Sequence, residues 1–85
     1  MREKEIEIGL ETGLEARPVA LLVQIASQFE SDIYIESGNK RVNAKSIMGM
    51  MSLALGSGEA VKVIADGKDE EEAIQSMEEY LSGKK

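Results

Sequence analysis

The sequence has 85 residues, enough for one compact domain, and we expect that domain to span residues 1–85. Ten basic and sixteen acidic residues give a net charge of −6, and aromatic residues make up only 4%, so direct binding to nucleic acid is not expected. The absence of both Cys and His excludes disulfides, Cys metal sites and catalytic triads of the usual kinds, and we expect no enzyme activity, metal or cofactor.

The first half of the chain alternates between strand and helix patterns. Polar and apolar residues alternate over Lys4–Leu10, which predicts a strand that is buried on one side. Apolar residues then recur at helical spacing from Ala16 to about Gln28, with Pro18 in the first turn, where helices tolerate it. Strands are predicted over Ser31–Glu36 and Lys40–Asn43, joined by a turn.

In the second half, Ser46 is expected to open a short helix that runs to Leu53. Alternation predicts a strand over Glu59–Asp66, and an amphipathic helix follows from Asp69 to Leu81, leaving a frayed tail over Ser82–Lys85. The predicted order is βαββαβα. We therefore expect an α+β fold: an open-faced β-sandwich with a four-stranded antiparallel sheet and three helices on one face.

The first candidate site is the start of the first helix. Glu15 immediately precedes this helix, and Arg17 lies in its first turn. One interpretation is a capping carboxylate that interacts with the positive end of the helix dipole. The other is a contact with an anion or a partner protein, made by Arg17 and free backbone N–H groups.

The second candidate site surrounds Ser46. A serine at this position is an ordinary helix N-cap, but its hydroxyl is also a candidate for phosphorylation. The helix that follows is too short to bury all its faces, so Ile47, Met48 and Met51 should be partly exposed. A phosphorylatable hydroxyl beside exposed apolar side chains would form a docking surface for a partner.

Two charged segments carry weaker signals. Asp69–Glu72 is interpreted as a solvated helix start that suits the positive end of the dipole. Lys40, Arg41 and Lys45 are either a solvated strand end or a surface that steers an acidic partner.

Both candidate sites resemble the HPr family of the bacterial phosphoenolpyruvate-dependent sugar phosphotransferase system. The resemblance runs from Glu5 to Leu81 and is most specific at Thr12–Pro18 and Val42–Gly49. It implies an HPr-like fold. The lack of Cys suits the reducing cytoplasm, where we expect the protein to be located. In this family the first motif carries a phosphoaccepting histidine, stabilised by the arginine, and the second carries a regulatory serine modified by HPr kinase/phosphorylase.

Glu15 stands where the family has its histidine. A carboxylate cannot form the phosphoramidate that makes the relay reversible, so the chain is most similar to the catabolite repression HPr-like (Crh) branch of the family, which also lacks this histidine. That resemblance implies that HPr kinase/phosphorylase modifies Ser46 and that the product binds the repressor CcpA as a corepressor in carbon catabolite repression. The matching contact positions are Arg17, Ser46, Ile47, Met48 and Met51.

Several alternatives stay open at this point. Glu15 either imitates a phosphorylated histidine or is a neutral substitution. The chain could instead be a phosphocarrier variant with an acyl phosphate on Glu15, or a module that docks on metabolic enzymes and inhibits them. It could act as a monomer or, by exchange of the strand Lys4–Leu10, as a homodimer.

Overall fold

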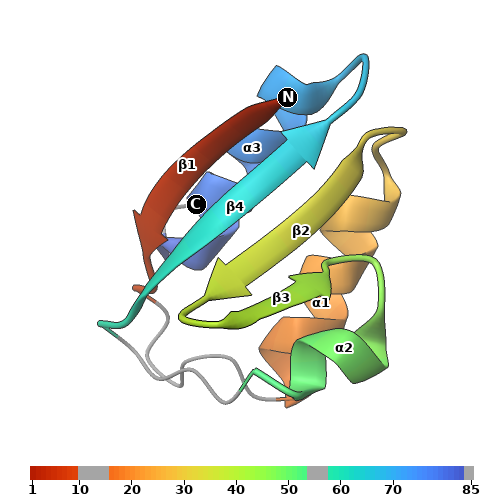
Figure 1. Cartoon of the computed structure of the whole chain (residues 1–85). Coiled ribbons are helices and arrows are strands. Elements are labelled where there is room, and N and C mark those ends of the chain that lie inside the picture. The colour runs from red at the N-terminus through yellow and green to blue at the C-terminus, as the bar shows by residue number, and fades with distance from the viewer. Residues whose placement is uncertain (10–15, 54–57, 84–85) are drawn as a thin grey trace.

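The structure is a computed structural model that describes residues 1–9, 16–53 and 58–83. Its elements follow the predicted βαββαβα order, as Figure 1 shows. The strands and helices are, in chain order, β1 (Arg2–Glu7), α1 (Ala16–Ser27), β2 (Asp32–Ser37), β3 (Lys40–Asn43), α2 (Ile47–Met51), β4 (Ala60–Asp66) and α3 (Glu70–Leu81).

The four strands form one antiparallel sheet in the order β1-β4-β2-β3. The three helices cover a single face of it, while the other face is uncovered (Figure 1). Alternate side chains of the inner strands therefore point into the layer between sheet and helices, as expected for a half-buried sheet. This confirms the predicted fold class.

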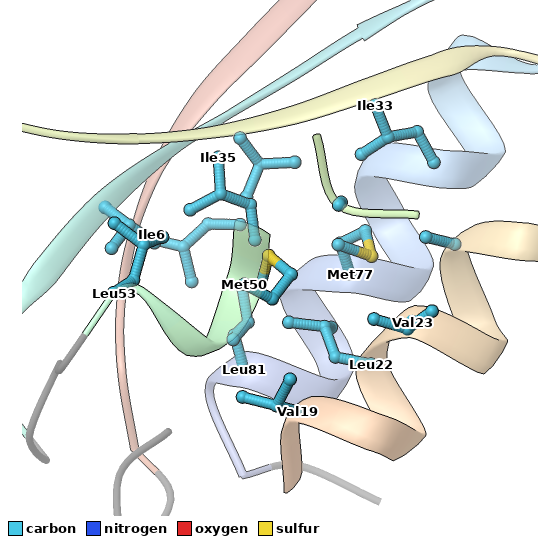
Figure 2. Close-up of a cluster of buried hydrophobic side chains, with 14 of the residues drawn as sticks. Ile6, Val19, Leu22, Val23, Ile33, Ile35, Met50, Leu53, Met77 and Leu81 are labelled. Carbon is cyan, nitrogen blue, oxygen red and sulfur yellow. The ribbon is translucent and has the colours of Figure 1, made fainter. Parts of the chain in front are cut away.

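The core lies between the sheet and the helices. Ile33 and Ile35 reach into it from β2, while Met50 of α2 and Met77 of α3 meet them from the opposite side (Figure 2). The α1 stripe predicted from helical spacing is buried, with exposed fractions between 0 and 8% for Val19, Leu22, Val23 and Ala26.

Strand β1 differs from its prediction at both ends. It begins at Arg2 because Arg2–Lys4 pair with Val63–Ala65 of β4, although none of these three residues is apolar. It ends at Glu7. The Ile8 N–H still donates to the Glu59 carbonyl (2.8 Å), but the Gly9 N–H donates to the Leu81 carbonyl (2.7 Å), so the backbone turns from the sheet toward the end of α3.

Helix α2 is shorter than predicted. It ends at Met51 and not at Leu53, because the N–H groups of Ser52 and Leu53 donate to carbonyls only three residues back, at 3.2 and 3.1 Å. Such bonds tighten a helix end into a 3₁₀-type turn. Leu53 nevertheless stays in the core at 3% exposure.

Two residues of the predicted frayed tail are ordered parts of the fold. The Ser82 N–H donates to the Glu78 carbonyl (2.9 Å) and the Gly83 N–H to the Tyr80 carbonyl (3.1 Å). The prediction was therefore wrong for Ser82 and Gly83, because a short stretch of polar residues says nothing about helix-capping bonds. Residues 84–85 lie outside the described part of the chain.

Asp69 has a structural role that its interpretation as a solvated residue missed. Its carboxylate accepts the N–H groups of Glu30 (2.9 Å) and Ser31 (3.0 Å) as well as the Ser31 hydroxyl. The hydrogen bond from the Ser31 hydroxyl, followed by that from the Glu30 N–H, lowers the pKa of Asp69 from its ordinary value. Asp69 thus ties the connection before β2 to the start of α3.

Asn at position 69 should therefore lower the thermal stability at neutral pH. The folded pKa of Asp69 is depressed, so its contribution to stability is complete above the unfolded pKa of about 4 and is lost as the pH falls through the folded value. We expect Asp69→Asn to lower the Tm by several degrees at pH 7, and this difference to shrink below about pH 4. Circular dichroism melting curves across this range provide the measurement.

The matched control is Glu72→Gln, which removes an exposed carboxylate from the same helical turn. It should leave the Tm nearly unchanged at pH 7. Equal Tm losses for the two variants would contradict the role assigned to the Asp69 hydrogen bonds.

Candidate functional site

Ser46 caps helix α2. Its backbone is extended (φ −109°, ψ 115°), and its Oγ accepts the Gly49 N–H at 3.2 Å while its carbonyl accepts the Met50 N–H at 2.9 Å. This is the geometry of an N-cap serine, as predicted. Ser46 is only partly buried, and its hydroxyl lies at the N-terminal end of α2.

The exposed apolar side chains of α2 follow from its length. Only Met50, which is fully buried, anchors this five-residue helix in the core. Ile47, Met48 and Met51 remain 49%, 85% and 55% exposed, as the sequence predicted. We call these three side chains the α2 apolar patch. It lies directly after Ser46 in the chain, so the hydroxyl and the patch belong to one surface element.

Leu21 is a further exposed apolar residue that the sequence reasoning did not single out. It lies on α1, which packs against α2, and it is 46% exposed. The signal was present in the spacing, since Leu21 falls outside the buried stripe formed by Val19, Leu22 and Val23.

The segment around Ser46 is positively charged within an acidic chain. Residues 37–58 contain three basic residues and no Asp or Glu, although the whole chain carries a net charge of −6. Lys45 Nζ donates to the Phe29 carbonyl at 2.8 Å, and the Arg41 guanidinium lies 4.5 Å from the centre of the Tyr34 ring. Lys40 Nζ lies 3.5 Å from the Ser52 carbonyl oxygen. These cations make no carboxylate ion pair within the described ranges, so their charge is not neutralised locally by Asp or Glu.

The other sequence-predicted site is described only in part. Arg17 belongs to α1, whose first turn lies at the same end of the molecule as α2 (Figure 1). Glu15 lies outside the described residues, as does the Arg17 side chain. The contacts expected of these two side chains therefore stay predictions.

Neither a metal centre nor a membrane span emerges from the described residues. No group of three or more acidic side chains in the described ranges is arranged to hold a metal ion. Among the helices of the same ranges, none combines the length and apolarity that crossing a bilayer requires.

The βαββαβα fold with its serine-capped second helix is that of an HPr-like domain. Residues 2–82 match the family described as "PTS HPr component phosphorylation site", and the chain belongs to this HPr family. Two curated relatives of the chain carry the name HPr-like protein Crh.

Within the family, the chain is similar to the HPr-like protein Crh. It is 53% identical over 81 residues to Crh of Halalkalibacterium halodurans, covering 95% of this chain and 96% of that protein. A crystal structure of the phosphocarrier protein HPr from Bacillus anthracis superposes with a TM-score of 0.91 at 48% identity, covering 94% of this chain and 95% of the other. A crystal structure of Bacillus subtilis Crh, described as an intertwined dimer with a swapped domain, gives a TM-score of 0.81 at 48% identity over 100% and 98% of the two chains.

Proposed function

We propose that this Crh-like member of the HPr family is a phosphoserine-dependent regulator of carbon catabolite repression. HPr kinase/phosphorylase modifies Ser46, and the phosphorylated protein binds the repressor CcpA as a corepressor. The contact residues are Arg17, Ser46, Ile47, Met48 and Met51. The DNA is contacted by CcpA alone, in keeping with the acidic composition of this chain.

One observation carries this proposal. The chain keeps a serine at the position of the family's regulatory serine, partly buried at the start of α2 beside the α2 apolar patch, but contains no histidine anywhere. The chain therefore cannot transfer phosphate through a histidine, whereas the Ser46 hydroxyl can still be phosphorylated. Regulation without phosphate transfer is the function that this combination supports best.

The physical mechanism is a local change of charge at Ser46. Phosphorylation adds about −1.5 to −2 charges to Ser46, in a segment that carries three cations and no carboxylate. The start of a helix tolerates this charge, so the core anchored by Met50 stays folded. A partner then recognises a dianion next to exposed apolar side chains, a combination that the unmodified protein lacks.

The strength of such a switch can be bounded. A charge-assisted hydrogen bond from the phosphate to a basic partner residue contributes roughly 1.5–3 kcal/mol, which corresponds to about a ten- to hundredfold gain in affinity. We expect Ser46-phosphorylated protein to bind CcpA more tightly than unmodified protein, with an affinity about ten- to a hundredfold higher. Ser46→Ala, treated in the same way, should bind no better than the unmodified protein.

Intact-mass analysis after two treatments provides the test. Purified HPr kinase/phosphorylase with ATP should add one phosphate to the wild-type chain and none to Ser46→Ala. Enzyme I with phosphoenolpyruvate should add none to either. An untouched Ser46, or equal CcpA affinity for Ser46→Ala and the phosphorylated chain, would refute the proposal.

The homodimer is the remaining partner to consider. Strand β1 is an edge strand that contributes only Ile6 to the buried core, and a swapped dimer is described for the Bacillus subtilis relative. A weakly apolar edge strand favours exchange between two copies of this chain. Light scattering distinguishes the monomer from such a homodimer by mass.

A further inference from the structure

The five methionines of this chain fall into two classes. Met50 and Met77 are fully buried in the core, one on α2 and the other on α3. Met48 and Met51 lie in the α2 apolar patch at 85% and 55% exposure, and Met1 is 73% exposed at the start of the chain. Two solvent-accessible thioethers thus flank the same buried anchor.

An exposed thioether is a target for peroxides. Hydrogen peroxide transfers one oxygen atom to the sulfur: the S–O bond forms, the O–O bond breaks, and the second oxygen leaves as water. The sulfur is oxidised by two electrons and the peroxide is reduced by two. A methionine sulfoxide reductase reverses the reaction by using a dithiol as the reductant.

The chain offers no competing thiol. It contains no Cys, so a thiol cannot consume the oxidant first. The sulfurs of Met50 and Met77 are inaccessible to solvent, because both residues are fully buried in the core. Peroxide chemistry at sulfur is therefore directed to Met48, Met51 and Met1.

We propose that Met48 and Met51 form a reversible oxidation site that switches the docking surface off; this effect on docking rests on the function proposed above. Each sulfoxide replaces an apolar group of the α2 apolar patch with a strongly polar one, and a partner that buries the patch must then desolvate that group. The core is not disturbed, since the buried anchor of α2 is Met50 and not its neighbours. Phosphate at Ser46 and an unoxidised patch would both be required for docking.

The first arm of the test uses the folded protein alone. Dilute hydrogen peroxide is added, the reaction is stopped at intervals, and peptide mapping by mass spectrometry follows each methionine. We expect Met48 and Met51 to be oxidised about tenfold faster than Met50 and Met77, or faster still. Equal rates in the native protein would overturn the assignment of the site.

The second arm measures docking. Ser46-phosphorylated protein, oxidised to completion at Met48 and Met51, should bind CcpA about tenfold more weakly or worse, and treatment with a sulfoxide reductase should restore binding. The double variant Met48→Leu with Met51→Leu keeps an apolar patch of similar volume. The same peroxide treatment should leave the CcpA affinity of this double variant at its own untreated value, whatever that value is relative to the wild type, even though Met1 is still oxidised.

The outcomes separate this inference from the proposed function. If the unoxidised phosphoprotein binds CcpA and oxidation leaves that affinity unchanged, the switch is refuted and the proposed function stands. If the unoxidised phosphoprotein does not bind, the proposed function fails, and the docking switch fails with it. The peptide map decides the selectivity of oxidation in either case.

Discussion

A histidine in place of Glu15 is expected to convert this protein from one that accepts no phosphate from phosphoenolpyruvate into one that does. The imidazole supplies a nitrogen nucleophile that forms a phosphoramidate, whereas the carboxylate of Glu15 would have to form an acyl phosphate. With enzyme I and phosphoenolpyruvate, Glu15→His should incorporate phosphate at least about a hundredfold faster than the wild type. Intact mass and the acid lability of the adduct provide the readout.

The matched control is Glu15→Gln, which removes the negative charge without adding a nucleophile. It should stay unmodified by enzyme I and should still accept phosphate on Ser46 from HPr kinase/phosphorylase. If enzyme I adds phosphate to the wild type but not to Glu15→Gln, the protein would be a phosphocarrier with an acyl phosphate on Glu15 and not a regulator. If Glu15→His folds but accepts no phosphate from enzyme I, the lack of an imidazole is not the reason that the wild type cannot transfer phosphate.

The same glutamine variant separates two interpretations of Glu15. If the carboxylate imitates a phosphorylated histidine, Ser46-phosphorylated Glu15→Gln should differ from the phosphorylated wild type in its CcpA affinity, most clearly at low salt. Equal affinity across several salt concentrations would indicate a neutral substitution.

The fold was predictable because its local patterns agree with its tertiary packing. Val19, Leu22 and Val23 repeat at helical spacing and are all buried, and Ile33 and Ile35 alternate along β2 and are both fully buried. The predicted bounds of an element were wrong where contacts between distant residues, and not the local alternation of polar and apolar residues, determine its ends. At the start of β1, the inward-facing positions are Arg2 and Lys4, which reach acidic residues of α3 instead of apolar partners.

Much of the candidate site was predictable for a related reason. A short helix has room for few buried side chains, so exposure of Ile47, Met48 and Met51 follows from its length. The role of Asp69 was not predictable, because its hydrogen-bond partners Glu30 and Ser31 lie 39 and 38 positions earlier in the sequence. No periodicity within α3 contains that information.

The close approach of Gly9 to the end of α3 is another contact that no local pattern reveals. The Gly9 N–H donates to the Leu81 carbonyl at 2.7 Å, and a Cβ on Gly9 would lie 2.2 Å from the Ser82 carbonyl oxygen. That oxygen belongs to the backbone, so it cannot move aside as the end of a flexible side chain could. The Gly83 backbone also adjoins Gly9, since a Cβ on Gly83 would lie 2.8 Å from the Gly9 carbonyl oxygen.

Gly9→Ala should therefore destabilise the fold more than a single methyl group ordinarily does. Relieving the clash requires the backbone after β1 to move away from α3, which weakens the bond to Leu81 and the packing of Ile8. We expect a loss of about 3 kcal/mol in the free energy of unfolding, from a total of roughly 4–13 kcal/mol for a domain of this size. The Tm should fall by roughly 12–24 °C, measured by calorimetry or circular dichroism.

Gly49→Ala is the matched control, because the same methyl group is added within helix α2. There the nearest atom to the added Cβ would be Ser46 Oγ at 3.4 Å, an ordinary contact, and alanine is favoured over glycine inside a helix by roughly 0.5–1 kcal/mol. The two substitutions should thus act in opposite directions: Gly49→Ala leaves stability unchanged or raises it, while Gly9→Ala lowers it sharply. Equal stability for Gly9→Ala and the wild type would contradict the close backbone contact between the segment after β1 and the end of α3. The hydrogen bond from Gly9 to Leu81 would then not determine where the strand ends.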